Sequence, residues 1–596
     1  MCGFITLYSS DEPWNKSTLR KGSYSMSNRG PDGSGEWWSD DNYVGIRHNR
    51  LSIIDLNDRS IQPMISINKR YIIAFNGEIY NYKKLRNELL RSGVNLTTQS
   101  DTEVLLELFS LYREDCLSKI SGMFAFSVWD KHEKKLFIAR DPYGIKPLYY
   151  AKSGKGYVVA SQVKAIISTE VVDKSPCPYG QGGYWLLGSV PEPYTWYRNI
   201  KSLPAGSYMW IDGEESCIKS WYSLPEIWDK DDIKENKKNV EKKVNELIYQ
   251  SVERHLVSDV PIGIFLSGGI DSTSLLAIID DIGKKNVVGI TLKYSEFESD
   301  VADESEIAKY IAKKYGVKHH VKTVTRSEFE NDMPEIFNSM DQPSIDGVNT
   351  WYASKCAAEI GLKVAISGTG GDELFQGYRS FTVLPNLVKY RNIFSKIPGV
   401  DNIISLIANK QAIRSGNARW NHFESLSKTL PGSWLLNRSV FSIEELKPLM
   451  GDDLYNEFAQ NYDPISFVLG MTGDLPKNNL LALSQIESMC YLRNQLLRDG
   501  DWASMCHGVE LRMPLVDSLL LKELSPYMNS FSKFPKKSLL SNAPNTPLDN
   551  FIKKKKKTGF GIPVNKWIKE IYPKLNSSSD NKIWPLLVAK KIYEIK

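Results

Sequence analysis

Two apolar segments in the second half of the chain each run into a glycine-rich turn, and this pattern constrains the fold more than any other feature. The first is PIGIFLSGGIDS at residues 261–272, and the second is LKVAISGTGGDE at residues 362–373. Between them, NVVGITLKY (286–294) has the composition of a buried strand and SEIAKYIAKKYG (305–316) that of an amphipathic helix. Strands that alternate with helices predict an α/β unit, with a parallel sheet covered by helices on both faces.

The first 210 or so residues have a different character. Short apolar runs such as YIIAFNGEIY (71–80) and MFAFSVWD (123–130) alternate with Gly, Asn and Asp turns, which is typical of β structure. A helix is expected at 82–93, where Gly93 provides the usual C-terminal stop. This part of the chain is therefore predicted to be mainly β.

The change of pattern indicates two domains. The segment 223–240 is polar and charged, as a linker would be, so we expect one domain at 2–222 and another at 241–596. Residues from about 381 to 530 are expected to be mainly helical and irregular. The chain has 596 residues, which is enough for two or three domains with their own cores.

Composition excludes several classes of protein. The 75 basic and 70 acidic residues leave a net charge of +5, which does not favour a dedicated nucleic-acid binder. The chain has no apolar run of the roughly 18 residues that a membrane helix needs, and no secretory signal follows Met1. Seven scattered cysteines without a CxxC pair argue against a disulfide framework or a zinc site. These observations predict a soluble protein of the cytoplasm.

Cys2 is a candidate nucleophile. Removal of Met1 would leave Cys2 with a free α-amino group, whose pKa of about 7.7–8.0 lies close to the thiol value of about 8.5. Proton transfer from the thiol to that amine is then nearly balanced at neutral pH, so one residue supplies both nucleophile and base. On its own, a cysteine at this position is more often an accident of position than a nucleophile.

The first glycine-rich turn is a candidate site for a polyphosphate. Gly268 and Gly269 allow backbone N–H groups to approach phosphate oxygens at the start of a helix, where anions are favoured. Ser267 and Ser272 add hydroxyl donors, and Asp271 can hold Mg²⁺. The turn lacks the GxxxxGK[ST] spacing of a Walker loop.

An ordered series of motifs follows Cys2: RGPD (29–32), RLSIID (50–55), NGEIYN (76–81) and SDTE (100–103). With GMFAFSVWD and RDPYGIKPLYY, they closely resemble the class II glutamine amidotransferase family. The resemblance implies an α+β N-terminal nucleophile hydrolase fold, an αββα sandwich, in which the cysteine attacks the amide of glutamine, forms a thioester and releases ammonia. It makes Cys2, Asn76 and Gly77 catalytic, and it assigns glutamine binding to Arg50, Asn76, Gly77, Glu78 and Asp101.

The chemistry of these side chains suits those roles. Arg50 can bind the α-carboxylate of glutamine with both arms of its guanidinium, and Glu78 with Asp101 can accept from the α-ammonium. Asn76 and the Gly77 N–H can form an oxyanion hole, in which each donor contributes about 3 kcal/mol in comparable acyl-transfer sites.

The second half, with SGGIDS (267–272), SGTGGDELFQGY (367–378) and KKKKKTGFGIP (553–563), is similar to the asparagine synthetase family. That resemblance implies an α/β parallel-sheet ATP pyrophosphatase domain with a helical C-terminal part, which activates a carboxylate as its acyl-adenylate. It implies Mg²⁺ at Asp271 and Asp372, with Lys557 as the catalytic lysine. The implied ATP-binding residues are Leu266, Ser267, Gly268, Gly269, Asp271, Ser272, Thr291, Ser367 and Gly368.

Two positions and one segment depart from the family pattern. Thr369 stands where asparagine-forming members usually carry an acid, and Asp346 or Glu373 is a candidate to replace that function. The segment 341–355 contains no Arg, although aspartate-using members have one near here. Lys555 stands where an Arg is common.

The resemblance therefore predicts glutamine- and ATP-dependent amidation of a carboxylate, with release of AMP and pyrophosphate and an internal ammonia tunnel. Aspartate is the first candidate acceptor, and a uronic sugar of a cell-surface polysaccharide pathway is the second. A catalytically silent scaffold is a third reading, which the presence of Cys2, Asn76, Asp271, Asp372 and Lys557 disfavours. We expect glutamine, ATP and a small carboxylate as ligands, neither nucleic acid nor membrane as partner, and leave a homodimer open.

Overall fold

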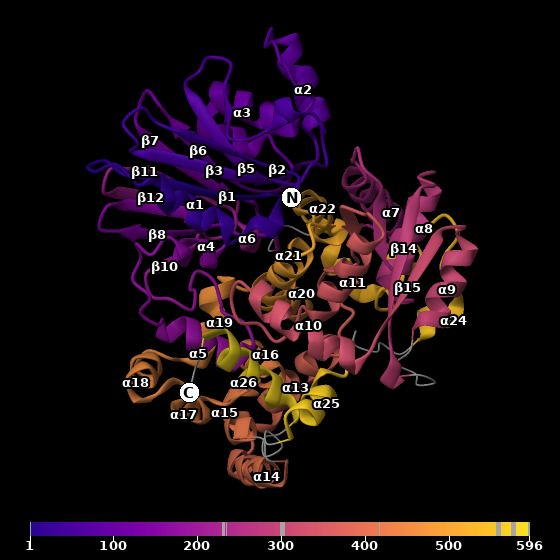
Figure 1. Cartoon of the computed structure of the whole chain (residues 1–596). Helices are drawn as coiled ribbons and strands as arrows, with labels where there is room; N and C mark the ends of the chain where they lie inside the picture. The colour runs from indigo at the N-terminus through magenta and orange to yellow at the C-terminus, as the bar shows by residue number, and fades with distance from the viewer. Residues whose placement is uncertain are drawn as a thin grey trace.

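We describe the fold from a computed structural model of the whole chain. The structure describes residues 2–228, 233, 235–297, 304–415, 418–555, 562–573 and 580–593. Figure 1 shows a β-rich part built from the first third of the chain, and a larger part that contains a second sheet and most of the helices. The marked N-terminus lies where the two parts meet.

The β-rich part, which we call the N-terminal sandwich, consists of two six-stranded antiparallel sheets. The first sheet has the order β10 (Ile200–Ser202), β8 (Tyr149–Ser153), β9 (Gly156–Ala160), β1 (Gly3–Tyr8), β3 (Val44–Arg50) and β2 (Gly33–Trp38). The second has the order β12 (Glu215–Ser220), β11 (Ser207–Asp212), β7 (Lys135–Arg140), β6 (Gly122–Asp130), β5 (Tyr71–Ile79) and β4 (Met64–Ile65).

The sandwich is layered because its central strands are apolar on both faces. Phe4 of β1 points into a core shared with Ile72 of β5, whereas Ile5 packs on the other side of its sheet. There it meets α1 (Lys16–Tyr24) and α4 (Val163–Ser168). On the outer face of the second sheet lie α2 (Tyr82–Arg91) and α3 (Asp101–Tyr112). The layers are thus helix, sheet, sheet and helix.

The second part contains a five-stranded sheet in which every pairing is parallel. Its order is β15 (Lys318–Val324), β14 (Val287–Tyr294), β13 (Ile262–Phe265), β16 (Val364–Ile366) and β17 (Glu510–Arg512). The helices around it are α7 (Lys237–His255), α8 (Ile270–Asp281), α9 (Ser305–Lys314) and α11 (Val348–Glu359). This agrees with the expected α/β unit, although β17 comes from far along the chain and its short run was not anticipated.

The rest of the chain is mainly helical, as expected. Its helices include α5 (Pro178–Leu187), α10 (Arg326–Ser339), α16 (Leu430–Arg438), a π-helical segment (Glu487–Leu497), α21 (Arg498–Met505), α25 (Val564–Ile571) and α26 (Asp580–Tyr593). The segment 223–240 contains α6 (Leu224–Trp228) and the first residues of α7. In the described part of the chain, no helix combines the length and apolar character needed to cross a membrane.

Candidate functional site

Cys2 lies buried at the start of β1, next to the end of β5. Its backbone N–H donates to Asn76 Oδ1 at 3.1 Å, and its Sγ lies 4.0 Å from the Leu51 carbonyl oxygen. Burial raises the pKa of the Cys2 thiol. Asn76 is buried too, and within the described residues its Nδ2 group has no hydrogen-bond partner. A buried N–H₂ group without a partner is a donor available to a ligand beside the thiol.

Gly77 is required by the backbone at this point. Its φ is +158°, and a Cβ there would lie 2.2 Å from the Met123 carbonyl oxygen on the neighbouring strand β6. No other residue fits without a shift of that strand. The structure thus places two of the predicted catalytic residues, Asn76 and Gly77, next to Cys2.

The predicted glutamine-binding residues surround the same point. Asp101, at the N-terminus of α3, accepts from the Ile79 N–H at 3.1 Å, and burial raises its pKa to about 6. Burial and the nearby Glu510 carboxylate raise the pKa of Glu78 well above its ordinary value. Arg50 ends β3 and donates to the carbonyl oxygens of Asn57, at 2.9 Å, and Asp55. We call the cluster of Cys2, Arg50, Asn76, Gly77, Glu78 and Asp101 the Cys2 site.

A residue that the sequence reading left without a role, Arg29, completes this cluster. Its Nε donates to the Cys2 carbonyl oxygen at 3.1 Å, and its two Nη groups bind Asp501 on α21 at 2.6 and 3.1 Å. Both side chains are buried. The sequence marks Arg29 as part of the RGPD motif, but its ion-pair partner Asp501 lies in the other half of the chain.

The two glycine-rich turns meet at the carboxyl edge of the parallel sheet. A Cβ at Gly368 would lie 2.7 Å from Asp271 Cβ, and one at Gly371 would lie 2.6 Å from Asp271 Oδ1. Gly268 and Gly370 adopt φ values of +68° and +91°, which glycine tolerates best. Because these glycines have no side chains, the two turns can approach each other closely. We call this place the Gly-turn site.

The remaining predicted ATP-binding residues line the same edge. The Ser267 N–H donates to Ser272 Oγ at 3.2 Å, and the Gly269 N–H lies 3.4 Å from Ser267 Oγ. Thr291 Oγ1 donates to the Leu266 carbonyl oxygen at 2.6 Å and lies 2.8 Å from His319 Nε2. The structure brings these residues together around the end of β13, next to Thr291 of β14.

Lys537 is a site residue that the sequence reading missed. Its Nζ lies 2.5 Å from a carboxylate oxygen of Asp271 and 2.5 Å from one of Asp372, the two predicted metal ligands. The two carboxylates raise its pKa to about 12, so it is charged at neutral pH. Two carboxylates that converge on one cation fit a site for Mg²⁺ as well, because Mg²⁺ binds through one or two carboxylates together with phosphate oxygens. The isolated PKKS sequence around Lys537 carries no pattern that could have found it.

The predicted catalytic lysine, Lys557, lies outside the described residues. Its neighbour Lys555 forms an ion pair of 2.5 Å with Glu304 at the start of α9. Of the departures from the family pattern, Thr369 Oγ1 lies 2.8 Å from Ser367 Oγ inside the second turn.

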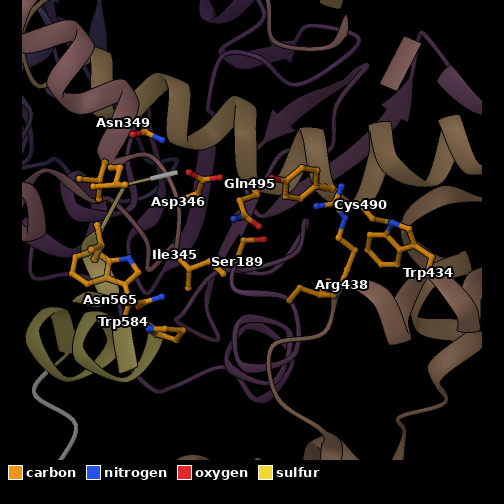
Figure 2. Close-up of a pocket in the computed structure, with 16 residues that line it drawn as sticks. Ser189, Ile345, Asp346, Asn349, Trp434, Arg438, Cys490, Gln495, Asn565 and Trp584 are labelled. Atoms are coloured by element: carbon orange, nitrogen blue, oxygen red, sulfur yellow. The ribbon is translucent and has the colours of Figure 1, made fainter. Parts of the chain in front are cut away.

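A cavity of about 390 Å³ lies among helices of the second half of the chain and α5. Figure 2 shows its lining, in which Asp346, Gln495 and Ser189 lie near the centre and Asn565 and Trp584 on one side. The lining also includes Arg438, Tyr491, Trp434 and Asn349. Residues from α5, α11, α16, the π-helical segment, α25 and α26 or their flanks meet here.

Arg438 places a positive charge in the same cavity as Asp346, although the segment 341–355 contains no arginine of its own. Its Nη2 pairs with buried Glu487 at 2.8 Å, and its guanidinium stacks on Tyr491 at 3.7 Å and on Tyr378 at 4.9 Å. The Tyr378 hydroxyl donates to Glu373 at 2.7 Å, and Glu373 directly follows Asp372. This chain of contacts joins the cavity to the Gly-turn site.

The two acids proposed to replace the missing one differ in position. Asp346 lines the cavity, and burial raises its pKa while Arg438 lowers it. Burial raises the pKa of Glu373 to about 7. Glu373 accepts a hydrogen bond from the Tyr378 hydroxyl and does not line the cavity. A third acid, Asp499, was not anticipated; burial and the Asp346 charge raise its pKa to about 7, and it accepts from Ser344 Oγ at 2.6 Å.

Comparison with known families and proteins matches both halves of the chain. The family of the glutamine amidotransferase domain matches residues 1–222, and the asparagine synthase family matches residues 243–591, more than half of the chain.

Individual relatives match over nearly the full length. Asparagine synthetase (glutamine-hydrolyzing) 1 of Bacillus subtilis strain 168 is 29% identical over 96% of this chain and 88% of its own length. A putative asparagine synthetase (glutamine-hydrolyzing) of Mycobacterium bovis is 30% identical over 93% of this chain and 85% of its own. Among solved structures, the allosteric regulatory enzyme of purine biosynthesis is 17% identical with a TM-score of 0.30, over 54% of this chain and 80% of its own.

Proposed function

Because this chain belongs to the asparagine synthase family and pairs that domain with a glutamine amidotransferase domain, we propose that it transfers the amide nitrogen of glutamine to a carboxylate. The acceptor is activated by ATP as an acyl-adenylate, and aspartate is the acceptor that the charged groups of the cavity, Arg438 and Asp346, complement. The overall reaction converts carboxylate, ATP, glutamine and water into amide, AMP, pyrophosphate and glutamate. The observation that carries the proposal is the pair of sites, each built from residues of the expected chemistry.

At the Cys2 site, the thiolate attacks the side-chain amide carbon of glutamine. The thiol proton passes to the α-amine that removal of Met1 exposes, and from there to the leaving ammonia. Asn76 Nδ2 and the Gly77 N–H donate to the oxygen that gains negative charge. Water then attacks the thioester carbonyl, which releases glutamate and regenerates the thiol.

At the Gly-turn site, the acceptor carboxylate attacks the α-phosphorus of ATP and displaces pyrophosphate. Asp271 and Asp372 would hold Mg²⁺, which offsets negative charge on the triphosphate. The Lys537 ammonium provides a fixed positive charge at the same place, and Lys557 is proposed to stabilise the charge on the α-phosphate. Ammonia then attacks the acyl carbon, and AMP leaves with its oxygen.

The cavity offers complementary groups for both ends of aspartate. Arg438 can bind the α-carboxylate, because its Nε is buried without a hydrogen-bond partner within the described part of the chain. Asp346 can accept from the α-ammonium, and it lines the same cavity. Arg438 thus supplies the arginine that the segment 341–355 lacks, from a helix about ninety residues further along the chain.

A second acceptor class, uronic sugars, is favoured by the size and lining of the cavity. About 390 Å³ is more space than a four-carbon amino acid needs, and pockets of this size hold larger ligands. The rings of Trp434 and Trp584 and the amides of Gln495 and Asn565 offer stacking and hydrogen bonds to a polyhydroxylated ring.

The test is pyrophosphate release with ATP, Mg²⁺ and glutamine in the presence of L-aspartate, D-glucuronate, D-galacturonate or their nucleotide conjugates. We expect release and asparagine with aspartate, and a rise of the aspartate KM in Arg438→Gln. The control is Arg326→Gln, which removes a surface ion pair with Glu570. Release only with a sugar acid would transfer the assignment to the second class, and no release with any acceptor would contradict the ligase assignment.

A further inference from the structure

Arg512 lies between the Cys2 site and the Gly-turn site and contacts both. It belongs to β17, which pairs with β16, and its carbonyl oxygen accepts from the N–H of Ser367, the first residue of the second glycine-rich turn, at 2.9 Å. Its Nη2 lies 3.3 Å from Glu78 Oε1, next to Gly77. A single residue of the parallel sheet therefore spans the distance between the two sites.

The guanidinium of Arg512 is shared by two buried carboxylates. Its Nε donates to Glu510 Oε1 at 2.6 Å, in addition to the contact with Glu78. Its Nη1 donates to the carbonyl oxygens of His255, at 2.9 Å, and Val257. Arg512 and Glu510 are 0% exposed and the Glu78 side chain 6%, so water screens these charges little.

A cation that binds at Glu78 changes the balance among these groups. The α-ammonium of glutamine would share the Glu78 carboxylate with Arg512, so ligand binding favours the position in which the guanidinium holds this carboxylate. Because the Arg512 backbone is bonded to Ser367, a shift of this residue reaches the turn that is proposed to bind ATP. Coupling of this kind is reciprocal, since each ligand changes the affinity for the other by the same factor.

We propose that Arg512 is a positioning residue that couples glutamine binding at Glu78 to nucleotide binding at the Ser367 turn, a role that rests on the proposed function of the two sites. In this role, Arg512 orients Glu78 from the other half of the chain, so the Cys2 site is complete only when the two parts are docked. Occupation of either site then favours the docked arrangement that the other needs.

The test uses the full-length chain in the Cys2→Ala background, where glutamine binds without being hydrolysed. Calorimetry measures the glutamine Kd with and without ATP–Mg²⁺ and aspartate. We expect ATP–Mg²⁺ to lower the glutamine Kd by at least about fivefold, within the usual range of coupling between sites. Arg512→Lys keeps the positive charge but loses the guanidinium, which contacts Glu78 and Glu510 at the same time. This variant should abolish the effect of ATP–Mg²⁺ on the glutamine Kd and should raise the glutamine Kd itself.

Two further variants separate coupling from damage to the fold. Glu510→Gln should strengthen the contact between Arg512 and Glu78 and alter the coupling without loss of ammonia-dependent synthesis. Arg254→Lys, which alters a neighbouring ion pair with Asp517, should leave the glutamine Kd and its response to ATP at the wild-type values. The coupling proposal is overturned if ATP–Mg²⁺ leaves the wild-type glutamine Kd unchanged, or if Arg512→Lys retains the full response. If the proposed function itself is wrong, glutamine or ATP does not bind to the chain at all. That result is distinct from the two outcomes that overturn the coupling.

Discussion

Arg29 and Asp501 form a bidentate ion pair across the junction of the two parts of the chain, and the same guanidinium binds the carbonyl oxygen of Cys2. The Nη–Oδ distances are 2.6 and 3.1 Å, and the Nε of Arg29 lies 3.1 Å from the Cys2 carbonyl oxygen. A buried pair of this geometry specifies how two surfaces dock, because any other arrangement leaves a charge without a partner. The position of Cys2 thus depends on Asp501, which lies 472 positions after Arg29 in the sequence.

Removing one member of this pair should be more harmful than removing both. Asp501→Asn leaves the Arg29 charge buried and is expected to cost about 3–5 kcal/mol of unfolding free energy. Arg29→Met combined with Asp501→Leu should recover most of that stability but not glutamine-dependent synthesis, because Cys2 loses its carbonyl contact. Thermal unfolding and the two synthesis rates measure this. Equal stability of the single and double variants would contradict the docking role.

Cys2→Ala should abolish glutamine-dependent amide formation and spare synthesis from added ammonia. The reason is that the thiol acts only at the first site, whereas ammonia enters the second reaction directly. The measurement is product formation with glutamine and with ammonium chloride. Cys217→Ala, which changes an exposed thiol, is the control. Loss of both activities in Cys2→Ala would argue against two separate reactions.

Glutamine use should fall as the pH drops through about 6. Burial raises the pKa of Asp101 to about 6, above the ordinary value for aspartate, so below that pH the carboxyl is protonated and cannot pair with an ammonium. We expect kcat/KM for glutamine to fall about tenfold per pH unit on the acid side. Asp101→Asn should have a low kcat/KM without the step near pH 6 that belongs to Asp101, while Glu78, whose pKa burial also raises, titrates separately. Glu107→Gln, on the same helix, should keep the wild-type profile.

Lys537→Met should weaken ATP binding strongly, whereas Lys537→Arg should retain part of it. Loss of the ammonium leaves the carboxylates of Asp271 and Asp372 next to the nucleotide phosphates with less compensation. The KM for ATP at fixed free Mg²⁺ is the measurement. Higher Mg²⁺ should partly restore Lys537→Met, because a divalent cation can replace the lost charge at the two carboxylates. A KM unchanged in Lys537→Met would remove this residue from the site.

Lys557→Ala should stop pyrophosphate release while leaving glutamine hydrolysis in place, because adenylation needs a cation at the α-phosphate. Lys553→Ala is a matched control in the same lysine run, since Lys553 donates to Asn542 at 2.8 Å. Normal pyrophosphate release by Lys557→Ala, or an equal loss in both variants, would contradict the proposed role.

Much of the fold and of both sites was readable from local sequence. The strands at 71–79 and 122–130, the glycine-rich turns at 267–269 and 367–371, and the residues around Cys2 carry patterns that depend on near neighbours. Buried strands are continuous apolar runs, and a tight turn demands glycine, so each of these features is determined within about ten residues. Cys2 and Asp271 were singled out in this way, whereas Asn76 was assigned through the resemblance to the glutamine amidotransferase family.

Other residues of the sites were determined only by the tertiary structure. Lys537 meets Asp271 across 266 positions, and Arg29 meets Asp501 across 472. Arg438 stands near Asp346 only because α16 folds back over the cavity. A single lysine or arginine has no local pattern, and its role depends on which carboxylate the fold brings within reach. The sequence by itself therefore determined the elements, the turns and the candidate nucleophile, whereas the counterions, the lining of the cavity at Arg438 and the contacts of Arg512 with Glu78 and Ser367 were decided by long-range packing.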